Sequence, residues 1–343
     1  MEIWDYARSW SRLLPQVTSS GSLLVFIALT TLIVSSSGWE HDSQIDGNYS
    51  SENYEKWSGA KLPSFIRNRR VLNGIAGNIR DSPSTVSLSR TLYFDNNKYL
   101  DLPEVLCGGS IIDETTISTA AHCIDIWPQH TPIYIIAGVS TFGKKNPGFQ
   151  VRVVNKRIVH PGWNRPTGKN DFALLKIVDP LKFSSAVQPA KIPTVTKFER
   201  LQAADPTDST YFFMLGFGTI EQTGKIWSRE AQMSISEQVP SVDCENIYLK
   251  DTPLAKLKFS NRRHFDNGKL CGVTYAGQTQ LNSGDSGIPI SYCPGKIPSS
   301  CVVVGLYSFR MRIATKQYEG YEKIGIHCDF IAQHARKGFQ CQN

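Results

Sequence analysis

The stretch Asn282-Ser283-Gly284-Asp285-Ser286-Gly287-Ile288-Pro289 combines serine, glycine and a carboxylate within a few residues. A serine hydroxyl becomes a nucleophile when a base removes its proton, and the oxyanion formed by its attack needs N–H groups aimed at it. Because glycine has no Cβ, Gly284 can turn its own N–H toward the same point as the N–H of Ser286. Taken alone, the stretch indicates only a turn, since Gly, Asp and Ser favour turns.

A histidine and an acid with suitable surroundings occur earlier in the chain. His122 lies in Ser118-Thr119-Ala120-Ala121-His122-Cys123, where small residues allow close packing and the adjacent cysteine can fix the loop. Asp171 leads into the apolar run Phe172-Ala173-Leu174-Leu175, where burial of a carboxylate requires a polar partner. Taken singly, a hydrogen-bonded loop histidine and a solvated turn residue explain these positions better than catalysis does.

With these motifs in the order His, Asp, Ser, the sequence resembles the trypsin/chymotrypsin family of serine endopeptidases over residues 71–342. The resemblance implies that Ser286 is the nucleophile, His122 the general base and then acid, and Asp171 the residue that fixes the imidazole tautomer. It implies that the N–H groups of Gly284 and Ser286 form the oxyanion hole. The fold expected from it is all-β, with two six-stranded antiparallel β-barrels, the site between them and a C-terminal α-helix.

The hydrophobic pattern after residue 70 independently favours sheet over helix. Short apolar runs alternate with turn residues, as expected of strands, in Thr85–Ser89, Ile133–Ala137, Val151–Val154, Tyr211–Leu215 and Val302–Tyr307. Helical periodicity appears late, over Asp329–Lys337, and Gly338 follows as a stop signal. We therefore expect one peptidase domain over 71–343, with the boundary between its barrels near 190–210.

The first 70 residues differ in character from the rest. The apolar run Leu23–Val34 precedes small residues suited to signal-peptidase cleavage and is shorter than the roughly twenty residues of a membrane span. We expect residues 1–38 to be a signal peptide of a secreted protein, with a membrane anchor through residues 22–34 as the alternative. Residues 39–70 form the expected propeptide, with a glycosylation sequon at Asn48.

The basic run Arg67-Asn68-Arg69-Arg70 ends directly before Val71-Leu72-Asn73-Gly74. A solvated linker explains such a run, but the family presents its activation site in this way. The resemblance implies that another protease cleaves after Arg70 and that the new Val71 ammonium inserts beside Asp285 as a buried ion pair. We expect the uncleaved precursor to be an inactive zymogen.

Eight cysteines all follow the expected activation site, which suits an exported protein with disulfides. The resemblance implies the pairs Cys107–Cys123 and Cys244–Cys271. Proximity in sequence suggests Cys293–Cys301 and Cys328–Cys341. The sequence lacks the Cys-x-x-Cys spacing of a zinc site, and residues 138–150 carry no carboxylate for calcium, so we expect neither metal nor cofactor.

The region of the expected specificity pocket departs from the family. Asn282 stands where a cysteine is normal, so a bridge beside the pocket is missing. Gln280 stands where trypsin-like enzymes place an aspartate, which disfavours substrates with Arg or Lys.

The edge strand beside that pocket also differs, because Ser308-Phe309-Arg310 replaces the usual Ser-Trp-Gly. The resemblance implies that Ser308 hydrogen-bonds Asp171. Arg310 either blocks or pairs with the substrate side chain, favouring an acidic one, or points to solvent.

The composition permits a large folded core, with 41% hydrophobic residues, and the net charge of +7 comes from basic residues scattered along the chain. We find no nucleic-acid motif and expect protein or peptide substrates, an activating protease and a protease inhibitor as partners. The competing functional class is a catalytically inactive serine-protease homologue that acts as a binding or regulatory protein. Labelling of Ser286 by a serine-directed probe would separate the two classes.

Overall fold

The computed structural model describes residues 75–94, 101, 105–144, 146, 148–205, 211–220, 226–240, 242–244, 268–275, 280–296 and 300–343. The expected signal segment, the propeptide, Asn48, Arg70 and Val71 lie outside these residues. Within them, the helices are all too short or too polar to cross a membrane.

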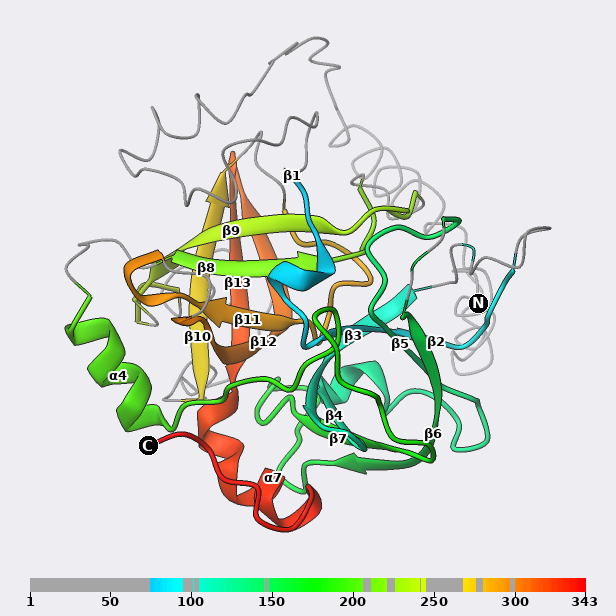
Figure 1. The fold of residues 1–343 in the computed structure, drawn as a ribbon. Helices are drawn as coiled ribbons and strands as arrows, with labels where there is room; N and C mark the ends of the chain where they lie inside the picture. The colour runs from blue at the N-terminus through cyan, green and yellow to red at the C-terminus, as the bar shows by residue number, and fades with distance from the viewer. Residues whose placement is uncertain are drawn as a thin grey trace, which may run out of the picture. The chain divides into compact units, whose positions relative to one another are not determined.

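The first barrel is closed by six antiparallel strands in the order β2-β3-β4-β7-β6-β5 (Figure 1). Its core consists of apolar side chains from all six strands, including Leu88, Ile111, Ile117, Ile135 and Leu175. The strands are β2 (Thr85–Ser89), β3 (Val105–Asp113), β4 (Thr116–Thr119), β5 (Tyr134–Ala137), β6 (Gln150–Val159) and β7 (Ala173–Ile177).

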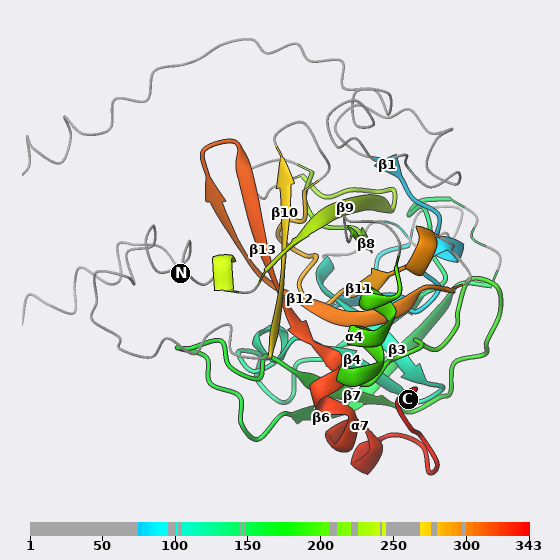
Figure 2. The same cartoon turned by 90° about the vertical axis from the view of Figure 1, so that its left-hand side faces the viewer.

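The second barrel follows the order β9-β10-β13-β12-β11-β8 and closes through pairing of β8 with β9, while β1 (Ile75–Ala76) adds to the edge of β9. In Figure 2 the curved strands β12 and β13 run side by side, as their register shows. The two barrels confirm the expected fold class. The strands are β8 (Tyr211–Gly216), β9 (Gln232–Val239), β10 (Lys269–Tyr275), β11 (Pro289–Tyr292), β12 (Val302–Ile313) and β13 (Lys316–Lys323).

Strand β13 is the unusual element of the second barrel, because three of its buried residues are polar. Gln317, Glu319 and Glu322 are each at most 1% exposed. Buried carboxylates need partners. Strand β10 beside it supplies two of them, because Lys269 contacts Glu322 and Thr274 Oγ1 lies 3.5 Å from Glu319.

Among the described residues, the helices α4 and α7 flank the barrels. α4 (Val195–Ala203) begins where the Thr194 side chain accepts a hydrogen bond from the Lys197 N–H, and no periodicity in the sequence had indicated it. α7 (Cys328–His334) is the expected C-terminal helix, but it ends before the predicted limit of Lys337. The chain turns extended at Ala335, and the Arg336 N–H bonds the Asp113 carboxylate at 2.7 Å instead of continuing the helix.

Short 3-10 turns complete the described structure. They are η1 (Ile79–Asp81), η2 (Ala121–Cys123), η3 (Pro294–Lys296) and η5 (Ile324–His327). Of these, η2 carries His122, and η5 leads directly into α7.

Four disulfides join the cysteines in the expected pairs: Cys107–Cys123, Cys244–Cys271, Cys293–Cys301 and Cys328–Cys341. The first ties β3 to η2. The last ties the start of α7 to the C-terminal segment.

Candidate active site

His122 sits on the tight turn η2, where Ala120 and Ala121 are fully buried and leave no room for larger side chains. Cys123 anchors the turn to β3 through Cys107. The side chain of His122 is 28% exposed, so one edge of its ring remains accessible. The local sequence thus fixes the backbone of the histidine and leaves its ring available for chemistry.

Asp171 lies directly before β7 and is 2% exposed. One oxygen accepts the backbone N–H of His122 at 2.9 Å, and the other lies 2.7 Å from Nδ1 of the same residue. Ser308 donates its hydroxyl to the second oxygen at 2.5 Å. Burial acts to raise the pKa of Asp171, but the hydrogen bond and charge of His122 and further donors outweigh it and hold the pKa below its ordinary value.

This arrangement orients the imidazole. A carboxylate that accepts from Nδ1 leaves the lone pair on Nε2, which faces away from Asp171. The expected contact between Ser308 and Asp171 is present, and it joins the second barrel to the first.

The turn around Ser286 depends on glycine at two positions. Gly284 has φ of +94° and Gly287 has φ of +84°. A Cβ at Gly284 would collide with the Trp227 ring, and one at Gly287 would collide with the Thr119 side chain. Other residues would therefore be strained and sterically blocked there.

The N–H groups of this turn fall into two sets. The N–H of Gly287 donates to Tyr307 O at 2.7 Å, and that of Asp285 donates to Asn282 O at 3.1 Å. Among the residues that the structure describes, the N–H groups of Gly284 and Ser286 have no acceptor. Two N–H groups without an internal acceptor, one on each side of Asp285, are what an anion-binding turn requires.

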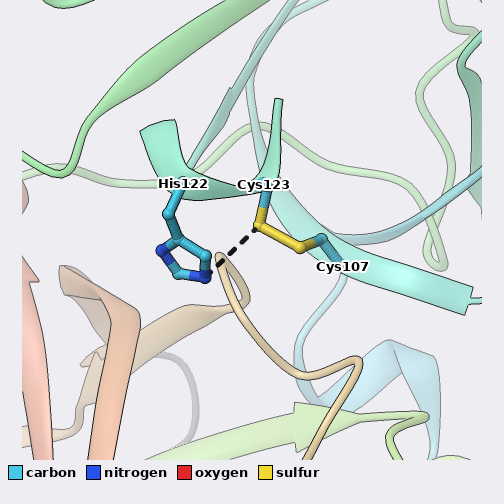
Figure 3. A group of neighbouring side chains, drawn as sticks. All are labelled: Cys107, His122 and Cys123. Atoms are coloured by element: carbon cyan, nitrogen blue, oxygen red, sulfur yellow. Dashed lines mark hydrogen bonds between the residues drawn. A yellow bond between two sulfur atoms is a disulfide. The ribbon is translucent and has the colours of Figure 1, made fainter. Parts of the chain in front are cut away.

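A single sulfur atom connects Ser286 to His122. The sulfur of Cys123 lies 3.6 Å from Ser286 O. It also lies 3.9 Å from Nε2 of His122, as the dashed line in Figure 3 marks. Ser286 O also accepts the Gly108 N–H from β3 at 2.7 Å. The serine turn of the second barrel is thereby seated against the histidine turn of the first.

Cys107, His122 and Cys123 also place three potential metal ligands close together, as Figure 3 shows. The two sulfurs are bonded to each other and cannot act as thiolates. The donor chemistry of this cluster therefore does not fit a metal ion.

Asp285 is buried beneath the turn. Its carboxylate accepts the N–H groups of Gly218 and Asn282, each at 2.8 Å. Burial raises the pKa of Asp285 to about 6, although these hydrogen bonds oppose the rise. Within the described ranges no ion pair reaches this carboxylate, so its negative charge lacks a cation in direct contact.

Arg310 does not point to solvent. It is half-buried, and its Nη1 donates to Leu281 O at 3.2 Å and to the Asn282 side chain. Gln317 of β13 donates to the same Leu281 oxygen at 2.9 Å. We call Arg310 and Gln317 the Leu281 clamp. It holds the segment before Ser286 by hydrogen bonds, at the place where the resembled family has a disulfide.

The remaining pocket residues are also engaged. Gln280 accepts from Arg312 Nη2 at 3.1 Å and donates to Tyr275 O at 3.4 Å. Phe309 packs with the Cys244–Cys271 bridge, and its ring covers Gly320, where a Cβ would collide with it. Neither side chain lies alone in an open pocket.

Sequence reasoning missed several buried polar residues around this site, namely Lys269, Gln317, Glu319, Glu322 and His327. The only available signal was the presence of charged residues inside segments that alternate like strands. Their partners become visible only when the strand register is known.

Comparison with known proteins identifies the family. The sequence model of the family described as Trypsin matches residues 71–331. The chain is 26% identical over 226 residues to the serine protease Hayan of Drosophila melanogaster, and this match covers 66% of the chain and 34% of that protein. It is 27% identical over 270 residues to a trypsin of Phaedon cochleariae, covering 77% of the chain and 88% of that protein.

The match to Hayan thus spans about a third of the length of that protein, whereas the match to the Phaedon trypsin spans most of its length. The family match covers most of the present chain and includes both barrels and every residue of the candidate site from His122 to Arg310. The chain belongs to the trypsin family of serine proteases.

Proposed function

We propose that this protein is a serine endopeptidase that hydrolyses protein or peptide substrates through Ser286, His122 and Asp171. The observation that carries the proposal is the double contact of Asp171 with His122, at 2.9 Å to its N–H and 2.7 Å to its Nδ1. This contact presents the lone pair of Nε2 on the side of the ring where the Cys123 sulfur and the serine turn lie.

In the proposed reaction, Nε2 of His122 takes the proton of Ser286 Oγ as that oxygen bonds the peptide carbonyl carbon. The N–H groups of Gly284 and Ser286 stabilise the resulting oxyanion. The imidazolium then gives its proton to the leaving amine as the C–N bond breaks. Water, activated by the same imidazole, releases the acid product and restores Ser286.

We propose that the chain is a zymogen cleaved after Arg70. Asp285 supports this proposal, because it is a buried carboxylate with a raised pKa of about 6 and no paired cation in the described structure. A Val71 ammonium beside it would supply that cation, lower the pKa of Asp285 and order the turn that carries Ser286. The family match begins at residue 71, the residue that this cleavage makes N-terminal.

We propose that the mature protein is secreted. The four disulfides support this proposal, because disulfides form and persist in oxidising compartments. N-terminal sequencing of the exported protein tests whether residues 1–38 are removed, and a retained run at residues 22–34 would instead indicate a membrane-anchored form.

We propose that the enzyme prefers an acidic substrate side chain near Arg310. In the described residues, Nη1 of Arg310 holds the Leu281 backbone while Nε and Nη2 have no partner, and Gln280 brings no negative charge. A peptide library cleaved by the activated enzyme tests this preference. Cleavage mainly after Arg or Lys would contradict it.

The decisive experiment is labelling with a fluorophosphonate before and after cleavage at Arg70. We expect labelling of Ser286 only in the cleaved protein, no labelling of a Ser286→Ala variant, and little in His122→Ala. Ser286→Ala should lower kcat by about 10⁶-fold, as loss of the nucleophile does in subtilisin. An Arg70→Gln protein should remain inactive toward a small ester. Absence of labelling in the cleaved wild type would support a binding or regulatory homologue.

A further inference from the structure

Three ionisable side chains lie buried behind Asp171, away from the substrate side. Lys269 of β10 stands directly opposite Glu322 of β13, and the two form an ion pair. His327, at the end of η5, places Nε2 at 2.7 Å from the other oxygen of Glu322. None of the three is more than 3% exposed. Burying such groups is costly, so their position calls for an explanation beyond filling the core.

This cluster reaches the proposed catalytic residues through Ser308. Lys269 Nζ lies 3.5 Å from Ser308 Oγ, and the same Oγ donates to Asp171. A lysine ammonium carries only donors, so the hydroxyl must accept from Lys269 and has its one hydrogen left for Asp171. Lys269 thereby fixes the direction of the Ser308 hydroxyl.

Lys269 also acts on Asp171 through its charge. Burial of Asp171 acts to raise its pKa, the hydrogen bond and charge of His122 oppose that effect most strongly, and the positive charge of Lys269 adds to the opposition. The cation therefore favours the carboxylate form of the residue that orients the imidazole.

Other elements hold the cluster in place. The His327 ring stacks on Phe172, the residue after Asp171, with centroids 4.3 Å apart and planes 10° from parallel. His160, after β6, meets the same ring edge-on at 4.9 Å, and its pKa is lowered by burial first and then by His327. The ionisable groups around Lys269 and Asp171 are Glu322, His327, His160 and His122. On the outer side, the charge of Arg165 also acts on Asp171, and that of Asp125 interacts with His122.

We propose that Lys269, anchored by Glu322 and His327, is a positioning residue that keeps the Ser308 hydroxyl directed at Asp171 and holds Asp171 ionised. The inference rests on the proposed function for its effect on turnover. Its geometry, however, concerns the Asp171–His122 pair and can be tested on that pair alone.

If Lys269 had a purely structural role, its removal would change the stability of the protein and leave the pH profile of kcat/KM unchanged. A positioning role predicts that the pH profile moves. Removing the cation makes the coupled Asp171–His122 pair take up a proton more easily. Because the base must be unprotonated to accept the serine proton, the acidic limb of kcat/KM should move to higher pH.

The experiment compares cleaved wild type with Lys269→Met. In the variant, we expect the midpoint of the acidic limb of kcat/KM to move to higher pH by about one unit. This is the lower end of the pKa shifts that a neighbouring charge produces. Lys269→Arg should restore most of the wild-type profile. Lys316→Met is the matched control, because Lys316 lies at the other, exposed end of the same β10–β13 pairing, opposite Tyr275.

Lys269→Met leaves Glu322 without its lysine and can fail to fold, so Lys269→Met/Glu322→Gln removes both charges. The limb should move in the same direction but less, because the removed cation contacts Ser308 and, among the described contacts, the removed anion does not. A folded single or double variant whose acidic limb coincides with that of the wild type would overturn the proposal.

A second readout separates this inference from the proposed function. In proteins that also carry Ser286→Ala, the titration midpoint of the His122 imidazole can be followed by NMR without turnover. We expect Lys269→Met to raise that midpoint and Lys316→Met to leave it unchanged. If cleaved wild type shows no hydrolysis while the midpoint still moves, the proposed function fails and the positioning role of Lys269 stands. An unmoved midpoint overturns that role.

Discussion

Glu319 and Glu322 lie on the same strand, β13, and are equally buried, yet their surroundings differ. Glu322 has the Lys269 ammonium on one oxygen and the His327 imidazole on the other. Glu319 has no ion pair in the described structure and accepts hydrogen bonds, among them those from Gln317 at 2.8 Å, Tyr321 at 2.6 Å and Thr274 at 3.5 Å. Although Arg310 stands opposite Glu319 on β12, its guanidinium bonds Leu281 and Asn282 instead.

The contrast between Glu322 and Glu319 shows how the surroundings of a buried carboxylate differ with and without a neighbouring cation. Without an ion pair, burial raises the pKa of Glu319 to about 7, and the nearby negative charge of Asp285 adds to the rise. Hydrogen bonds oppose the shift but do not cancel it. Behind Asp171 the chain supplies a cation, whereas beneath the Ser286 turn two neighbouring carboxylates remain without a paired cation in the described residues.

The largest expected effect comes from ionising the two unpaired carboxylates in the intact precursor. An acid whose folded-state pKa is raised binds more protons in the folded state, so stability falls as pH rises from its unfolded pKa through its folded one. For Asp285 the window runs from 3.8 to about 6, and for Glu319 from 4.5 to about 7. Ionisation of each carboxylate should lower the free energy of unfolding by roughly 3 kcal/mol between acidic pH and pH 8.

Urea unfolding across this pH range, compared with Glu319→Gln and Asp285→Asn, measures the two contributions. If Val71 supplies the cation of Asp285 as proposed, cleavage after Arg70 should remove the contribution of Asp285 and leave that of Glu319. Parallel stability profiles for the wild type and both variants would contradict the assignment.

Replacing the paired glutamate should have the next largest effect. At pH 6, Glu322→Gln leaves the Lys269 ammonium buried without a counter-charge and should lower the free energy of unfolding by about 3 kcal/mol or more. Glu319→Gln, the matched change on the same strand, should alter it by at most ~1 kcal/mol, because Glu319 is largely protonated at that pH. Equal losses in thermal or urea unfolding would remove the distinction between the two glutamates.

Arg310 extends the comparison of the two glutamates, because its guanidinium hydrogen-bonds the Leu281 carbonyl and the Asn282 side chain and does not pair with Glu319. Arg310→Ala removes half of the Leu281 clamp and should reduce kcat/KM of the cleaved enzyme by about tenfold, or ~1.4 kcal/mol of transition-state stabilisation. Arg310→Lys should recover only part of this loss, since lysine lacks the planar fork. Lys316→Ala, on the same hairpin, is the control; an equal loss there would point to general charge effects.

The smallest effect is expected for an exposed ion pair. Arg336 and Glu114 bond at 2.6 Å, but the arginine side chain is 70% exposed. Arg336→Ala should change the free energy of unfolding by ~0.5 kcal/mol or less, because water screens such pairs. A loss as large as that of Glu322→Gln would mean that burial does not explain the difference between ion pairs in this protein.

The sequence predicted the fold class and the neighbourhood of the site because those features depend on local chemistry. Three short sequence motifs indicate the site. They are the glycine-rich turn around Ser286, the small residues beside His122, and the acid that precedes an apolar strand. Their family order then implied the barrels and two of the disulfides, and proximity in sequence suggested the other two. The contact of Ser308 with Asp171 could be anticipated in the same way.

The polar interior of the second barrel could not be predicted, because it depends on which strands pair. Lys316–Lys323 contains four charged residues and has the composition of a surface strand, although Glu319 and Glu322 are buried. The partner of Glu322 lies far away in sequence and becomes its neighbour only through the β10–β13 register. The early end of α7 likewise depends on a contact with Asp113 that no local pattern contains.

The sulfur of Cys123 lies close to both Ser286 and His122, so we expect reduction of the Cys107–Cys123 disulfide to impair the candidate site. Reductants added during purification should erode turnover while circular dichroism still reports an intact sheet, since β3 and η2 would lose their tether before the barrels open. Storage without such additives would then be a condition for measuring activity at all.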